Sequence, residues 1–153
     1  MQTVEDLSIF IRQKAKLLHS TSRAMIYNAG SKTASTEYKN DHPFLLKQPL
    51  YCRYASKSVL HDYFFQRRVN QDFLSLEYIQ EGQIYIRSES KAYLLEAGDL
   101  CLIHPGHKSG LLHLPDNRCR KYGVIIGGNG LEETLRLLHL THTSCFSLPD
   151  SQH

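Results

Sequence analysis

Short apolar runs alternate with turn residues through the middle of the chain. The runs are rich in aromatic and β-branched residues and recur about every ten residues between Leu50 and Gly128. Glycine and proline separate them, notably Gly82, Gly98 and the pair Pro105–Gly106. Many short strands at regular spacing predict a β-sandwich or barrel. The runs are LYCRYA, VLHDYFF, FLSLEYI, QIYIRS, AYLLEA, DLCLIH, GLLHL and KYGVII.

The segments on either side of this region have a different pattern. Apolar positions at three-to-four spacing predict an amphipathic helix over 4–19, either a lid on the same domain, which we favour, or a partner-binding helix. Residues 28–49 indicate an irregular arm, preceded by a short strand over 24–27. LEETLRLLHL predicts a short helix and SCFSLP a last strand. We therefore divide the chain into 1–48 (helix and arm), 49–128 (barrel) and 129–153 (helix and strand).

Composition limits the classes of function. A chain of 153 residues suits one domain, and its net charge of +3 is too small to support nucleic-acid binding by bulk charge. No apolar run reaches the ~18 residues of a membrane span, and the acidic start does not resemble a signal peptide. We expect a cytoplasmic protein without membrane contact. The four cysteines form no CxxC pair, which favours reduced, buried thiols.

Two groups of polar residues are candidates for chemistry. Glu77 lies inside the run FLSLEYI, so its strand face points either to water or into a polar interior, and periodicity alone leaves both open. His104, His107 and His113 lie near one turn. A divalent metal would need three or four such ligands on one wall of a pocket, whereas the alternative is solvated loop histidines.

The stretch from Phe64 to Gly127 resembles the cupin-type effector-binding domain of AraC-family transcription regulators. The most specific part runs from Tyr93 to Gly106 and follows a turn at Tyr78–Gly82. The resemblance implies a mainly β, cupin-like double-stranded β-helix, a jelly-roll barrel, with an N-terminal helix and a short C-terminal helix. The matching segments are FFQRRVNQDFLSLEYIQEGQIYI, AYLLEAGDLCLIHPGHKSG and CRKYGVIIGG.

The resemblance also implies positions for a small-molecule ligand, which we expect to be a sugar or an organic acid. Arg67 matches a family arginine on the strand before the conserved hairpin, and a guanidinium can bind adjacent hydroxyls or a carboxylate. Ser109, Leu111 and Tyr122 match ligand-facing positions on later strands. Glu77 joins them if its face lines the barrel. For each residue the alternative is a side chain that only fills the interior.

Metal-dependent cupin enzymes use a His-x-His pair with a Glu and a later His, and this chain has residues 72–75 and Ser109 at those places. We therefore expect no catalytic residues, no metal and no cofactor. Family members continue into dimerisation helices and a helix-turn-helix domain, so we expect DNA contact only through a part missing here, and a homodimer as a candidate assembly. Two alternatives stay open: a small cupin enzyme with a metal on His104, His107 and His113, and a stand-alone small-molecule binder.

Overall fold

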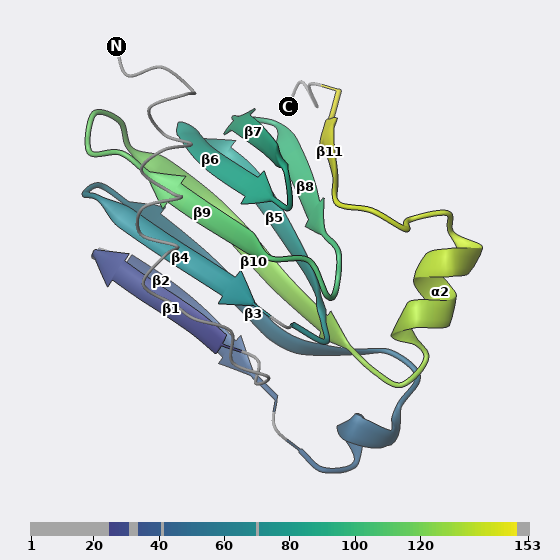
Figure 1. Cartoon of the computed structure of the whole chain (residues 1–153). Helices are drawn as coiled ribbons and strands as arrows, with labels where there is room; N and C mark the ends of the chain where they lie inside the picture. Colours follow the sequence, from purple (N-terminus) through teal and green to yellow (C-terminus); the bar gives the residue numbers. More distant parts are fainter. Residues whose placement is uncertain (1–24, 31–33, 41, 70, 150–153) are drawn as a thin grey trace.

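Two antiparallel β-sheets face each other in the computed structural model, which describes residues 25–30, 34–40, 42–69 and 71–149 (Figure 1). The first sheet has five strands in the order β1-β4-β9-β6-β7, and the second has six in the order β11-β8-β5-β10-β3-β2. The prediction of a mainly β, cupin-like fold with a short C-terminal helix is confirmed. The helix predicted over 4–19 lies outside the described residues.

The strands follow the predicted apolar runs closely. The first run and the start of the second merge into one long strand, β3, and each of the others becomes one strand. The first sheet contains β1 (Met25–Gly30), β4 (Phe64–Val69), β9 (Ser109–His113), β6 (Gln83–Ser88) and β7 (Lys91–Glu96). The second contains β11 (Ser144–Ser147), β8 (Asp99–Ile103), β5 (Leu74–Glu81), β10 (Cys119–Gly127), β3 (Tyr51–Leu60) and β2 (Ala34–Lys39). The helices are η1 (Leu45–Lys47) and α2 (Leu131–Leu137).

Two expectations need correction. The sheets do not close into a barrel: in the described part of the chain, strand pairing stays within each sheet, and side chains packed between the sheets join them instead. The expected arm is also more regular than predicted. β1 pairs with β4 in one sheet and β2 pairs with β3 in the other. Each added strand satisfies backbone groups that would otherwise be left on an open sheet edge.

The main apolar core lies between the sheets, and a second cluster lies outside them. In the core, Phe64, Ile86 and Leu111 of the first sheet pack with residues of the second, such as Ile79 and Ile103. The outer cluster joins α2 to the second sheet through Leu74, Leu102, Leu131 and Leu135. Both faces of β5 are therefore covered. In the described ranges no helix is long and apolar enough to cross a membrane.

The hairpin between β5 and β6 turns at a position that only glycine fits. Gly82 has φ +77°, and a Cβ atom there would overlap the backbone carbonyl oxygen of Arg118. Gly106, which follows β8, has nearly the same φ of +78°, but a Cβ atom would meet nothing within 4 Å. Substitution of Gly106 therefore measures the cost of the backbone conformation alone, and substitution of Gly82 adds the cost of the steric overlap.

We predict that Gly82→Ala lowers the free energy of unfolding by about 3 kcal/mol or more, since it adds overlap to the left-handed conformation. Gly106→Ala should cost about 1–2 kcal/mol, the conformational part alone. Urea unfolding followed by circular dichroism measures both values. Equal losses in the two variants would contradict the overlap at Gly82.

Candidate functional site

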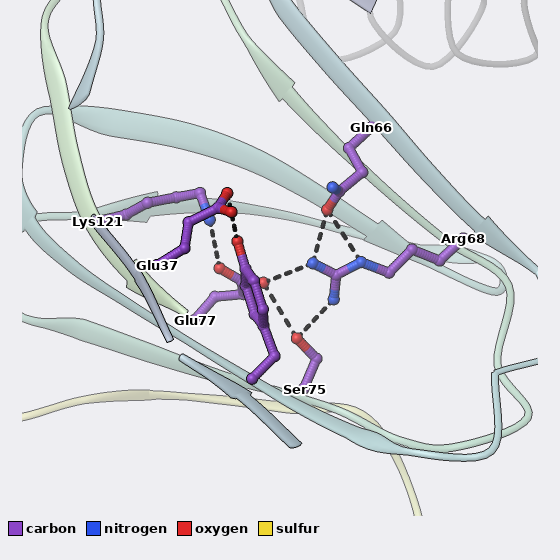
Figure 2. A network of polar contacts seen from close by, with 7 residues as sticks. Glu37, Gln66, Arg68, Ser75, Glu77 and Lys121 are labelled. Atoms are coloured by element: carbon purple, nitrogen blue, oxygen red, sulfur yellow. Dashed lines mark hydrogen bonds and ion pairs between the residues drawn. The ribbon is translucent and has the colours of Figure 1, made fainter. Parts of the chain in front are cut away.

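One part of the space between the sheets is polar, although it is as buried as the apolar core (Figure 2). A carboxylate, Glu77, lies at its centre and is contacted from both sheets. Five residues form this polar network, which consists of Gln66 and Arg68 on β4, Ser75 and Glu77 on β5, and Lys121 on β10.

Both carboxylate oxygens of Glu77 accept charged hydrogen bonds. Arg68 Nη2 lies 3.0 Å from Oε1, and Lys121 Nζ lies 2.7 Å from Oε2. Ser75 Oγ donates to Oε1 at 3.1 Å. The Glu77, Arg68 and Lys121 side chains are only 1%, 6% and 5% exposed. Two cations therefore share one buried carboxylate, and one of them reaches it from the opposite sheet.

Gln66 fixes the direction of the Arg68 guanidinium. Its Oε1 accepts from Arg68 Nε at 2.9 Å and from Nη2 at 2.6 Å. Arg68 Nη1 also donates to Ser75 Oγ on β5. A planar guanidinium with several donors suits this multiple contact better than an ammonium group. Arg68 thereby links β4 to β5 across the gap between the sheets (Figure 2).

Strand alternation explains how these charges come to lie inside. On β4, Phe64 belongs to the apolar core, and Gln66 and Arg68 follow it on the same face. On β10 the inward positions include Lys121 and Gly123. A Cβ atom on Gly123 would lie 3.2 Å from Glu77 Oε2, closer than usual, so glycine leaves room for the carboxylate.

The two cations keep Glu77 ionised. Burial raises the pKa of its carboxyl, but Coulomb attraction to Lys121 and to Arg68 and the hydrogen bonds from both outweigh it, so that the pKa falls to about 2. The favourable interactions exist only with the charged form. The network therefore stabilises the fold as long as Glu77 is deprotonated.

Unused hydrogen-bonding groups lie next to the network. Ser58 is the register partner of Lys121 and Ser109 that of Arg68, and the buried Oγ atoms of both serines have no hydrogen-bond partner among the described residues. Within the same part of the chain, Lys121 Nζ makes one hydrogen bond, to Glu77, which leaves two of its three protons for another acceptor. Buried polar groups without partners are uncommon and indicate a place where a ligand or water can bind.

The network continues towards the edge of the second sheet. Tyr54 Oη donates to Glu37 Oε1 at 2.8 Å, and the Glu37 side chain is 36% exposed. Burial, followed by the hydrogen bond with Glu37, raises the pKa of Tyr54. Because β2 is an edge strand, these residues form the more accessible side of the polar region.

The structure brings together three of the five predicted ligand residues. Glu77, Ser109 and Leu111 are buried on faces directed between the sheets, which decides between the two faces left open for Glu77. Arg67 and Tyr122 lie on the outer faces. Arg67 alternates with the inward Gln66 and Arg68, so we replace it by Arg68 in the site. The Tyr122 ring lies 6.4 Å from that of Tyr78 and 5.7 Å from Lys57 Nζ on the outside of the second sheet.

Arg68 and Lys121 were not among the ligand residues predicted from the sequence. Each belongs to a pair of adjacent basic residues in which one points inward and the other outward. The spacing from a core residue indicates which member of each pair points inward. Arg68 lies four residues after Phe64, and Lys121 lies two residues after Cys119, and both Phe64 and Cys119 are in the core. An even spacing along a strand places residues on one face.

The three histidines considered for a metal do not come together. The ring centroids of His104 and His107 are 5.0 Å apart, and His142 is the next ring beside His107. His113 lies instead on β9, with Nδ1 2.7 Å from the carbonyl oxygen of Asp62. Across the described ranges no group of three or more His, Cys, Asp or Glu side chains could hold a metal ion. The structure thus gives no support to the alternative of a metal enzyme on this set.

A β-sandwich with a polar centre fits the family to which the chain belongs. Residues 54–153 match the family model of the AraC-like ligand-binding domain, so the chain is a member of that family. This confirms the resemblance drawn from the sequence and gives the chain a small-molecule-binding role. A search of curated proteins finds no match.

Solved structures support the fold. YhaK from Escherichia coli is 19% identical, with a TM-score of 0.57, over 75% of this chain and 51% of its own. The bacterial pirin YhhW from Escherichia coli, solved in complex with nickel(II), is 14% identical, with a TM-score of 0.51, over 82% of this chain and 59% of its own. The chain thus spans about half the length of YhaK, and at these identities the likeness concerns the fold alone.

We predict that stability falls in acid as Glu77 takes up a proton. Its pKa is lowered on folding, so the contribution of its charge is present above about pH 4.5 and is lost as the pH falls towards 2, which amounts to about 3 kcal/mol. Glu77→Gln should cost about 3–5 kcal/mol at neutral pH, because Arg68 and Lys121 lose their shared counter-charge. It should also flatten the decline in acid. Urea unfolding at a series of pH values measures both effects.

Glu81 provides the matched control on the same strand. Its carboxylate is 44% exposed and lies 3.6 Å from Arg120. Glu81→Gln should change stability by less than about 1 kcal/mol, because exposed ion pairs contribute little. A Glu77→Gln variant as stable as Glu81→Gln would contradict the proposed role of the buried network.

Proposed function

We propose that this chain is the effector-sensing part of an AraC-like transcription regulator and that the effector binds at the polar network between the sheets. The observation that carries the proposal is the buried Glu77 carboxylate with its two cations, next to hydroxyl groups without partners. A domain that needed only stability would fill such a position with apolar side chains at no loss. Membership of the ligand-binding family supports the same role.

The chemistry of the site favours a small, oxygen-rich effector. Lys121 has protons left for a carboxylate or hydroxyl oxygen, and the hydroxyls of Ser58 and Ser109 can both donate and accept. Leu111 is the register partner of Gln66 and belongs to the apolar core, so it would supply apolar contact for a carbon skeleton. Sugar acids, hydroxy acids and sugars combine these features, and Glu77 would accept from their hydroxyls.

Regulation would follow from the way the network joins the sheets. Arg68 on β4 binds Glu77 on β5, so an effector oxygen that competes for Arg68 or Lys121 alters the link between the sheets. A ligand that prefers one arrangement shifts the population towards it. In an AraC-like regulator this shift would reach a DNA-binding domain outside this chain, in the cytoplasm and within a homodimer. On this proposal the chain performs no catalysis.

We predict that a panel of sugars, sugar acids and hydroxy acids contains a compound that raises the melting temperature, because a ligand of the native state stabilises it. Calorimetric titration then gives the affinity. Lys121→Met, which keeps the aliphatic part of the side chain, should weaken binding about tenfold or more, since it removes a charged hydrogen bond.

Two outer-face variants are the controls. Lys57→Met removes a lysine that lies over the outer ring of Tyr122, and Arg67→Ala removes the outward arginine of β4. Both should bind the effector as the unmodified chain does. Binding that is insensitive to Lys121→Met but lost in Arg67→Ala would move the site to the outer face. A panel without any stabilising compound would contradict the proposed ligand class.

A further inference from the structure

Two cysteines face each other where the last described strand joins the second sheet. Cys101 on β8 and Cys145 on β11 are register partners of an antiparallel pair, and β11 runs along β8 in Figure 1. Their Sγ atoms lie 2.7 Å apart, and both thiols are free. Cys101 is fully buried in the apolar core, whereas Cys145 is partly exposed. One thiol can therefore meet a solvent reagent while its partner is protected.

Hydrogen bonds on both sides of Cys145 hold β11 in place. Before the strand, Thr143 Oγ1 accepts from the backbone N–H of His104 at 3.1 Å. At its end, Ser147 Oγ donates to Asp99 Oδ1 at 2.8 Å, and the N–H of Leu148 donates to the carbonyl of Gly98 at 3.0 Å. These hydrogen bonds therefore keep the two thiols side by side.

The register also suits a covalent bond. Residues directly opposite each other on antiparallel strands have Cα atoms about 4.5–5.5 Å apart. Disulfides in proteins span Cα distances of about 4.4–6.8 Å. The pair can therefore be joined by rotating the two side chains, without a shift of the backbone.

The environment assigns different roles to the two thiols. The hydrogen bond between the sulfur atoms, with burial as a further cause, raises the pKa of Cys101. The same bond lowers the pKa of Cys145, because the Cys101 thiol can donate to a thiolate on Cys145. The thiolate is the reactive form of cysteine. The more exposed thiol is thus also the better nucleophile.

We propose that Cys101 and Cys145 are a modification site at which a peroxide forms a reversible intramolecular disulfide. The Cys145 thiolate attacks one peroxide oxygen, the O–O bond breaks, and the leaving oxygen takes up a proton to give water or an alcohol. The Cys101 sulfur then loses its proton and attacks the sulfenic sulfur of Cys145, whose hydroxide leaves as water. The thiols lose two electrons and the peroxide gains them, and an external dithiol reverses the bond by exchange.

The bond would attach the end of the described chain to the core. The loop that it closes contains β9, β10 and α2. Restricting such a loop in the unfolded chain favours the native state, and the effect grows with loop length. Oxidation should therefore stabilise the domain even in the absence of an effector, so the proposal stands independently of the ligand proposed above.

The full chain is treated with hydrogen peroxide and then with an alkylating reagent, and is analysed by intact mass and peptide mapping. We expect the loss of two hydrogen atoms, a linked Cys101–Cys145 peptide that a dithiol releases, and a melting temperature raised by roughly 5–10 °C. Cys145→Ser should abolish all three changes and instead leave Cys101 unreacted in its buried position.

Cys52, which is exposed, and Cys119, which is buried, provide the controls. Cys52→Ser should keep both the crosslink and the rise in melting temperature, and Cys119→Ala, which leaves no polar group in the core, should keep the crosslink. Cys101→Ser would alter the core, so the test compares the crosslink and the melting temperature of Cys145→Ser with those of the unmodified chain. A crosslink to Cys52 or Cys119, oxidation of Cys145 to a sulfinic acid without a crosslink, or no reaction before the domain unfolds would each overturn the proposal.

Discussion

The charged contact of Glu77 with Arg68 and Lys121 is the interaction on which the arrangement of the sheets depends. An ionised carboxylate buried alone is too costly to occur, so the position of Glu77 is acceptable only with its partners in place. One partner belongs to the opposite sheet and the other to the neighbouring strand. The sheets must therefore meet in one register for the charges to pair. Such a network contributes less to net stability than apolar packing would, but it penalises every misaligned arrangement.

The space between the sheets is thus divided by chemistry. The apolar part, with residues such as Ile79 and Leu111, supplies the hydrophobic driving force, and the polar part holds groups that can exchange partners. Helix α2 adds to this division, because Leu131 and Leu135 pack with Leu74 on the outer face of β5, whereas the inner face carries Glu77. Apolar packing on the outer face helps to hold β5 in the sheet while its inner face carries the charged Glu77.

The local features of the fold were predictable, and the long-range ones were not. Apolar runs and turn glycines are local signals, so the central strands, α2 and β11 appeared where expected. A strand was predicted only for the first part of β1 and none for β2, because the rest of these two strands is defined by pairing with distant strands. The choice between Arg67 and Arg68 required the inward face of β4, which Phe64 indicates only once the core is known. Closure into a barrel likewise depends on whether the edge strands of the two sheets pair with each other, which no short sequence motif specifies.

The polar network and the thiol pair meet in one cross-strand row of the second sheet. Glu77 on β5 is the register partner of Cys101 on β8, and Cys101 is the partner of Cys145 on β11. On the other side, Gly123 of β10 lies opposite Glu77. The negative charge of Glu77 is also among the causes that raise the pKa of Cys101.

Any change in the spacing of β5 and β8 therefore acts on both sites. An effector that altered the hydrogen-bond partners of Glu77 would change the environment of the Cys101 thiol. A disulfide would in turn restrict the movement of β8, the strand that pairs with β5 at Glu77. The two proposed sites are separate in chemistry, but the sheet makes them neighbours.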